Sequence, residues 1–224
     1  MVSEQLHVRQ FQIIHDDLRD ATIIVAGVGM LGSWTALAMA RCARKVYIFD
    51  HDVVGEENLG TQAYNADQVG DSKVASLAEQ GWGLPIIEWS TKFPIGLPLI
   101  EVLEEKPNHL VFISCVDSFQ ARKECAQWAW DNGVDLFVDT RAAAEICVVC
   151  LVPYEKLPQY IETLNTDEDA PDVACGLEGT AYVGMGVASR VASRVNAYFR
   201  GLPVPAKTVE NLALAQMIMK EDME

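Results

Sequence analysis

The chain has 224 residues, half of them hydrophobic, and a formal net charge of -15 at pH 7. This acidity argues against nucleic acids and anionic membranes as partners, because both attract basic surfaces. The length predicts one domain spanning residues 1–224. The sequence starts without a secretory pattern and has no apolar run of about 18 residues, so we expect a cytoplasmic protein.

The first half of the sequence alternates between helical and extended patterns. Apolar residues at helical spacing predict an N-terminal helix over 3–18. TIIVAG then predicts a strand, MLGSWTALAMARCARK a helix with cations in its last turn, and VYIFD a second strand. This order matches a βαβ unit between Thr22 and Asp50. KVASLAEQ predicts the next helix and PIIEW the next strand.

The second half continues the alternation. HLVFISCVD is so apolar that we expect helices on both faces of its sheet. SFQARKECAQWAWDNG predicts a helix that ends at Gly133, and VDLFVDT and EICVVCLVP predict two strands. Acids and prolines then predict an exposed crossing loop over about 154–175, before a long helix in GTAYVGMGVASRVASRVNAYF. The segment after Pro205 fits either a helix or an added edge element.

These patterns together predict an α/β protein, with a Rossmann-like three-layer α/β/α fold, a mainly parallel central sheet and a C-terminal extension. Within it, GVGMLG places Gly27, Gly29 and Gly32 as G-x-G-x-x-G between a strand and a helix. This spacing lets the backbone turn tightly and approach a phosphate at the helix N-terminus. Asp50 ends the next strand, where a carboxylate can accept hydrogen bonds from ribose hydroxyls. The sequence therefore predicts a nucleotide site without specifying the nucleotide.

The six cysteines lie mostly in apolar segments, which is typical of buried free thiols and argues against a disulfide framework. Cys147 and Cys150 form C-x-x-C inside a predicted strand, where side chains alternate between faces. The sequence has no second C-x-x-C, so we expect core packing here and no zinc site.

Further motifs follow the glycines: Asp-x-Asp-x-Val, Asn-Leu-x-x-Gln, Gly-x-x-Lys and Asp-x-Phe-x-x-Arg. Their order resembles the ThiF, MoeB and ubiquitin-activating-enzyme superfamily over roughly Leu6 to Phe199. Those enzymes adenylate the C-terminal carboxylate of a small ubiquitin-like or sulfur-carrier protein. VDTR and Cys-x-x-x-x-Thr-x-Tyr resemble the short ThiF-like proteins of bacteria, plasmids and phages. The resemblance implies an adenylyltransferase that uses ATP and magnesium (Mg2+), with a small protein or peptide as partner.

The resemblance also implies roles for individual residues. The nucleotide contacts it implies are Gly27, Gly29, Gly32, Asp50, Asp52, Asn58, Gln62 and Lys73. The catalytic residues it implies are Arg9, Lys73, Asp117 and Cys175. Asp117 would hold magnesium, and Arg9 would reach the nucleotide of the other subunit in a homodimer. Cys175 matches a loop cysteine that some members use for transfer, and it also fits a small buried residue at a helix start.

One position departs from the family pattern. Thr61 stands where the usual Asn-Leu-x-Arg-Gln has an arginine, and threonine cannot replace a charged, bidentate guanidinium. Either Arg9, Arg141 or another cation compensates, or catalysis is slow or lost. A binding subunit without activity is therefore a second interpretation. A tRNA threonylcarbamoyladenosine dehydratase and a nicotinamide-dependent oxidoreductase are further alternatives, and Arg122 fits a structural salt bridge best.

Overall fold

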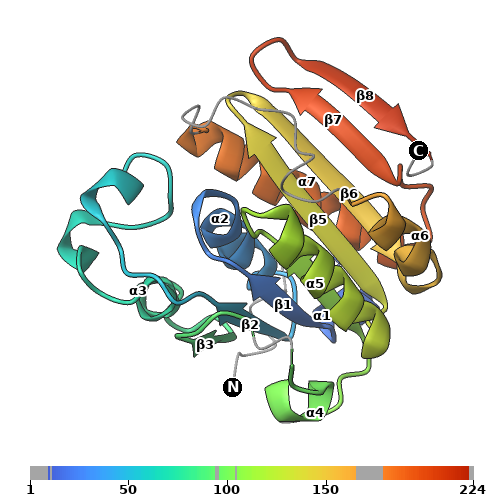
Figure 1. Ribbon diagram of the computed structural model, residues 1–224, viewed down its shortest axis with the longest axis horizontal. Coiled ribbons are helices and arrows are strands. Elements are labelled where there is room, and N and C mark those ends of the chain that lie inside the picture. Colours follow the sequence, from blue (N-terminus) through green and yellow to red (C-terminus); the bar gives the residue numbers. More distant parts are fainter. Residues whose placement is uncertain (1–9, 11, 94–95, 104, 165–178, 222–224) are drawn as a thin grey trace.

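The computed structural model describes residues 10, 12–93, 96–103, 105–164 and 179–221. The eight strands in this described part of the chain form one sheet in the order β3-β2-β1-β4-β5-β6-β7-β8 (Figure 1). The strands are β1 (Thr22–Ala26), β2 (Lys45–Phe49), β3 (Ile86–Trp89), β4 (Leu110–Ser114), β5 (Leu136–Ala143), β6 (Ile146–Pro153), β7 (Lys207–Asn211) and β8 (Gln216–Lys220). The first five strands of this order, from β3 to β5, are parallel to one another. Each of β6, β7 and β8 is antiparallel to the strand before it.

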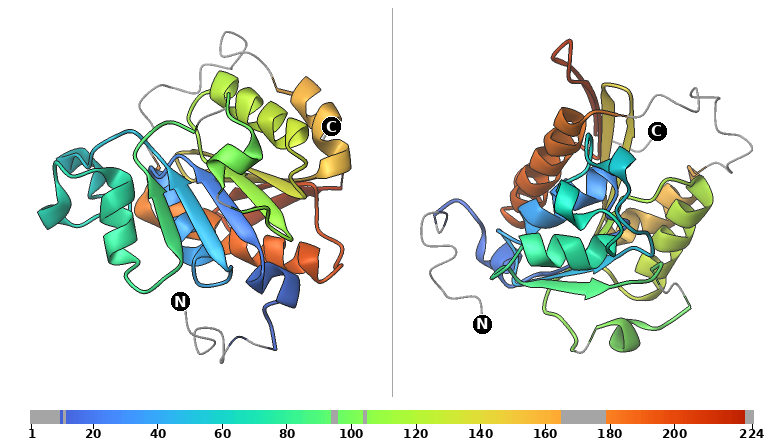
Figure 2. Two further views of the ribbon diagram at one scale, coloured as in Figure 1. Left: turned by 90° about the horizontal axis from the view of Figure 1, so that it is seen from below. Right: turned by 90° about the vertical axis from the view of Figure 1, so that its left-hand side faces the viewer.

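Helices cover the sheet on both faces. The α-helices are α1 (Asp16–Arg19), α2 (Met30–Met39), α3 (Lys73–Gln80), α4 (Leu99–Val102), α5 (Phe119–Asp131), α6 (Leu157–Glu162) and α7 (Ala181–Phe199). Short 3-10 turns among the described residues are η2 (Glu56–Asn58), η3 (Ala66–Gln68) and η4 (Tyr154–Lys156). Helix α7 lies on one face of the sheet, and α5 and α6 lie on the other (Figure 2). Side chains of α2, α3 and α7 pack in one core, and side chains of α5 and α6 pack in a second core.

Strand β1 shows why the apolar runs of the sequence become central strands. All five of its residues are buried. Ile23 and Val25 point into the core beneath α2 and α7, while Ile24 and Ala26 point into the core beneath α5. A strand covered on both faces has no solvent side, so its sequence is continuously apolar rather than alternating. The expected three-layer fold is confirmed, and the C-terminal extension is the hairpin of β7 and β8.

The predicted helix over 3–18 is wrong in its described part. Only α1 is helical there, and residues 12–15 form a turn and an extended link. Asn196 of α7 explains the difference, because its side chain accepts from the His15 N–H at 2.9 Å and donates to the Ile13 carbonyl at 3.0 Å. These bonds replace helical ones. Residues 3–9 lie outside the described part of the chain.

Two other expectations are corrected. The helix α2 ends at Met39, so the cations expected in its last turn lie beyond it; Arg44 and Lys45 pair with Glu105 instead. The expected crossing loop begins later than residue 154, because η4 and α6 occupy 154–162. Proline in the first turn of α6 is compatible with a helix, and the first residue of α6 is fully buried. Residues 165–178 of that loop lie outside the described chain.

None of the described helices combines the length and the apolar character that a membrane span requires.

Candidate functional site

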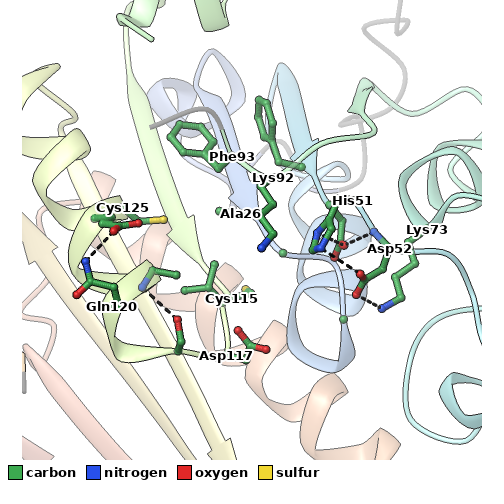
Figure 3. Close-up of a pocket in the computed structure, with 18 residues that line it drawn as sticks. Ala26, His51, Asp52, Lys73, Lys92, Phe93, Cys115, Asp117, Gln120 and Cys125 are labelled. Carbon is green, nitrogen blue, oxygen red and sulfur yellow. Dashed lines mark hydrogen bonds and ion pairs between the residues drawn. The ribbon is translucent and has the colours of Figure 1, made fainter. Parts of the chain in front are cut away.

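A cavity of about 730 Å³ opens at the carboxyl ends of β1, β2 and β4 (Figure 3). Strand β1 lies between β2 and β4, so the connections leave it in opposite directions at this point. Open α/β sheets bind ligands in the crevice that this reversal creates. The walls come from the glycine turn, the residues after β2, the start of α3, the loop after β3 and the N-terminal part of α5.

Each of the three glycines of the turn has a different structural role. Gly27 has a φ of 84°, and a Cβ there would lie 2.9 Å from the Cys115 carbonyl oxygen. A Cβ on Gly32 would overlap the carbonyl oxygen of Gly27, so Gly32 allows α2 to pack against the turn. Gly29 has no atom within 4 Å of its Cβ position and lines the cavity at the N-terminus of α2. Gly29 therefore provides the open approach that a phosphate needs.

This difference predicts separate effects of two alanine substitutions. Gly32→Ala is expected to lower the free energy of unfolding by about 1–3 kcal/mol or more, because backbone must move to accept the methyl group. Gly29→Ala is expected to leave stability near that of the wild type but to weaken nucleotide binding, since its methyl group enters the cavity. Urea unfolding and titration with ATP measure the two effects. Equal stability of both variants would contradict the assignment.

Asp50 links the glycine turn to the segment after β2. Its side chain is almost fully buried; Oδ2 accepts from the Val28 N–H at 2.8 Å and Oδ1 accepts from the Asp52 N–H at 2.9 Å. Tyr64 donates its hydroxyl to the Val28 carbonyl at 2.7 Å. Burial, assisted by the charges of Asp50 and Asp52, raises the pKa of Tyr64, so its hydroxyl stays a donor. The carboxylate thus shapes the turn as well as facing the cavity.

Lys73 and Asp52 form an ion pair at one side of the cavity. Lys73 is the first residue of α3, is 6% exposed, and places Nζ 3.1 Å from Asp52 Oδ2. Its backbone N–H donates to the Asp52 carbonyl at 3.0 Å, which fixes the helix start against the segment after β2. Asp50, His51 and Asp52 also bring three potential metal ligands close together, with His51 exposed. The sequence identified the ion-paired residues as site residues but did not predict their pairing.

Asp117 lies across the cavity from Lys73, in the loop between β4 and α5, and is exposed. Ser118 caps α5 by accepting from the Ala121 N–H at 3.1 Å. Arg122 is buried, pairs with Asp139 of β5, and donates to the Val116 carbonyl at 2.7 Å. The pair with Asp139 confirms the structural salt bridge expected for Arg122. The bond to Val116 lets Arg122 also hold the loop that carries Asp117.

Some predicted site residues do not line the cavity. Asn58 accepts from the Gly55 N–H at 2.9 Å and so caps η2. Gln62 has a buried Oε1 without a hydrogen-bond partner among the described residues. Thr61 also lies outside the cavity wall, and its carbonyl accepts from Trp34 at 3.1 Å. Arg141 pairs with Asp139 at 2.7 Å rather than entering the cavity.

The nucleotide contacts of Asn58 and Gln62, like those of the residues that line the cavity, therefore remain predictions. Arg9 and Cys175 lie outside the described residues, so their roles also remain predictions.

The cavity wall includes residues that sequence reasoning missed. Lys92 and Phe93 follow β3, and Cys115 and Cys125 lie near the cavity floor. Burial raises the pKa of Cys115 to about 11 and that of Cys125 to about 12, so both thiols are neutral at physiological pH. For Lys92, Phe93 and Cys115 the available signal was their position after a strand, because loops at the strand ends form the wall of such a crevice. Cys125 lies within α5 and gave no such signal.

Cys147 and Cys150 pack on opposite faces of β6, as strand alternation predicts. Cys147 belongs to the core beneath α2 and α7, and Cys150 belongs to the core beneath α5 and α6. Burial is the main cause that raises the pKa of each thiol.

The fold and the glycine turn define a Rossmann-like α/β protein with a nucleotide-type crevice. The sequence matches the ThiF family over residues 3–217, and the chain belongs to that family.

Relatives by sequence are longer than this chain. Ubiquitin-like modifier-activating enzyme 5 of Drosophila mojavensis is 28% identical over 151 residues, which cover 60% of this chain and 38% of the relative. The enzyme of the same name from Aedes aegypti is 31% identical over 122 residues, which cover 48% of this chain and 30% of the relative. The chain therefore matches only about a third of these proteins.

Similar solved structures support the fold alone. Escherichia coli MccB, solved with ATP, aligns with a TM-score of 0.69 at 14% identity and covers 98% of this chain and 72% of its own. E. coli TcdA, a tRNA N6-threonylcarbamoyladenosine dehydratase, aligns with a TM-score of 0.67 at 17% identity and covers 90% and 98%. PaaA aligns with a TM-score of 0.66 at 17% identity, covering 92% of this chain and 65% of its own.

Proposed function

We propose that this protein uses ATP to adenylate a carboxylate, releasing pyrophosphate, and that the carboxylate is the C-terminus of a small ubiquitin-like or sulfur-carrier protein or peptide. The observation that carries the proposal is one cavity that joins the open Gly29, Asp50, Lys73 and Asp117. Membership of the ThiF family supports it. Further support comes from relatives named as ubiquitin-like modifier-activating enzymes and from MccB structures that contain ATP or MccA.

In the proposed reaction, a carboxylate oxygen of the substrate attacks the α-phosphorus of ATP. The bond from that phosphorus to the bridging oxygen breaks, and the electron pair leaves with pyrophosphate. Gly29 and the N-terminus of α2 would receive phosphate oxygens, Asp50 would orient the ribose, and Lys73 would offset developing negative charge. No covalent bond to the enzyme is needed for this step.

The exposed carboxylate of Asp117 fits a magnesium ion. Magnesium commonly binds one or two carboxylates together with substrate phosphates. Asp117 lines the cavity and does not belong to the acidic group of Asp50, His51 and Asp52, so it would supply one carboxylate and the phosphates of ATP would supply further oxygens. When bound, the ion would stabilise negative charge on the phosphates. Asp117 would hold it, and Arg122 would keep the Asp117 loop in place.

The proposal extends to assembly and transfer. We treat the chain as one domain, because its described strands form one sheet. A homodimer would let Arg9 of one subunit reach the nucleotide of the other. In a later step the Cys175 thiolate would attack the acyl carbon of the adenylate, forming a thioester and releasing AMP. These assignments rest on the family resemblance, since both residues lie outside the described chain.

A second candidate function is a nucleotide-binding subunit without catalytic activity. It is favoured by Thr61, which replaces the family arginine and lies outside the cavity wall. The retained Asp50, Lys73 and Asp117 oppose it. The dehydratase alternative finds support in the fold of TcdA, but the net charge of -15 argues against a tRNA substrate. The glycine turn and Asp50 would also suit a nicotinamide cofactor, but the described cavity wall offers no evident partner for hydride transfer.

Exchange of radiolabelled pyrophosphate into ATP, with magnesium and small proteins that end in a free Gly-Gly carboxylate, tests the proposal. The wild type is expected to exchange label only with the carrier present. Asp117→Ala is expected to lower exchange by about 100-fold or more, because a group that stabilises transition-state charge is lost. Asp131→Ala, an exposed acid at the far end of α5, is the matched control and should exchange normally.

One outcome would contradict adenylation by the natural protein, and another would contradict the role proposed for Asp117. Exchange that appears only in Thr61→Arg would identify a subunit whose missing arginine explains its inactivity. Equal exchange by wild type and Asp117→Ala would remove Asp117 from the proposed machinery.

A further inference from the structure

The described cations that line the cavity are Lys73 and Lys92, and they differ in their partners. Lys73 is buried and paired with Asp52 at 3.1 Å. Lys92 forms no hydrogen bond or ion pair with another described residue, and its amino group points into the cavity in Figure 3. Of these two described lysines, Lys92 is therefore the one whose charge is not already offset by a carboxylate within ion-pair distance.

The backbone on both sides of Lys92 is held in place. Ser90 and Ser72, at the N-cap of α3, share a hydrogen bond at 3.2 Å. Phe93 is buried, and its ring packs edge-on against Phe112 and Trp128 with centroid separations of 4.8 Å each. These anchors place the Lys92 side chain at the cavity without requiring it for folding.

The charges around the cavity make a second available cation important. Its described wall carries four carboxylates, from Asp50, Asp52, Asp117 and Glu124, against two lysines. A nucleoside triphosphate brings several further negative charges into this space. Enzymes that transfer phosphoryl or nucleotidyl groups offset such charge with positioned cations. The family position for one of them holds Thr61, which does not line the cavity.

We propose that Lys92 is a nucleotide-binding residue that donates a hydrogen bond to a phosphate of bound ATP, and that it supplies the charge absent at position 61. The inference rests on the proposed nucleotide site and adds to that site a residue from the loop after β3, away from the segment that contains Thr61. A lysine ammonium acts as a point charge rather than a bidentate fork, so the contact would provide charge with less geometric control than arginine. The phosphate contact also makes Lys92 a determinant of which nucleotides bind well.

Isothermal titration of Lys92→Gln with ATP, AMP and adenosine tests this assignment. We expect ATP to bind about tenfold more weakly or worse, as for the loss of a hydrogen bond to a charged group. AMP should lose less, and adenosine should bind as it does to the wild type. Lys92→Arg should restore most ATP binding. Lys123→Gln is the matched control, because Lys123 is exposed on α5 and does not line the cavity.

Each result decides the question. Unchanged ATP binding by Lys92→Gln would overturn the proposal and leave the adenylation function standing. Equal losses for ATP and adenosine would also overturn it, because a phosphate contact cannot affect adenosine. A wild type that binds no ATP would refute the nucleotide site and Lys92 together. Selective loss of ATP binding, in a protein that fails pyrophosphate exchange, would support Lys92 while refuting adenylation.

Discussion

Replacing Asp50 with alanine is expected to abolish nucleotide binding and to destabilise the protein at the same time. The carboxylate accepts the Val28 and Asp52 N–H groups at 2.8 and 2.9 Å, so its removal leaves both donors without their acceptor. A buried donor left unsatisfied costs about 1–3 kcal/mol. The first of these donors lies inside the glycine turn, so the same change disorganises the surface that would receive the phosphates.

Urea unfolding followed by circular dichroism, and titration with ATP, measure the two effects on the same sample. Asp50→Asn separates them, because the amide keeps one acceptor but loses the charge and one acceptor position. We expect Asp50→Asn to fall between alanine and the wild type in stability. Asp67→Ala, an exposed acid in η3 outside the cavity, is the control and should retain both properties. Full stability of Asp50→Ala would show that water replaces the carboxylate at the turn.

The central strands and the glycine turn could be predicted because their signals are local. The continuous apolar run of β1 is what a strand buried on both faces requires, and its residues divide between the two cores. Gly27 needs its positive φ, and Gly32 needs to lack a Cβ. These are requirements that only glycine meets, so the residue type itself carries the information.

The N-terminal segment and α6 could not be predicted because distant residues decide their conformation. Asn196 bonds the backbone of Ile13 and His15 from a position more than 180 residues away in sequence. Leu157 and Tyr160 turn α6 toward the core beneath α5, although prolines and acids nearby are typical of a loop. Tertiary contacts overrode local preference in both segments.

Site residues that belong to sequence motifs could be predicted. Site residues that the path of a loop brings to the cavity could not. Asp50, Lys73 and Asp117 were expected together, and all three line the cavity. Lys92 belongs to no motif, and its place depends on where the loop after β3 is anchored by Phe93. The ion pair between Lys73 and Asp52 was also missed, because sequence separation of 21 residues does not indicate contact.

The largest expected effect on stability alone comes from Asp139→Asn. Asp139 is fully buried at β5 and pairs with Arg122 and with Arg141, the latter at 2.7 Å. The Tyr160 hydroxyl also donates to its carboxylate at 2.6 Å. Removing the negative charge leaves the buried guanidinium of Arg122 without its counterion and next to the partly exposed Arg141, and breaking a buried pair in this way costs about 3–5 kcal/mol.

Urea unfolding should therefore give a much lower midpoint for Asp139→Asn than for Glu105→Gln. Glu105 also pairs with two cations, Arg44 and Lys45, at 3.1 and 2.8 Å, but its side chain is 45% exposed, so water replaces the lost partner. Each variant removes one acid that pairs with two cations, but the expected loss of stability is large for the buried acid and small for the exposed one. If both variants lost equally little stability, the Asp139 cluster would have to be hydrated, and the anchoring of the Asp117 loop through Arg122 would need another explanation.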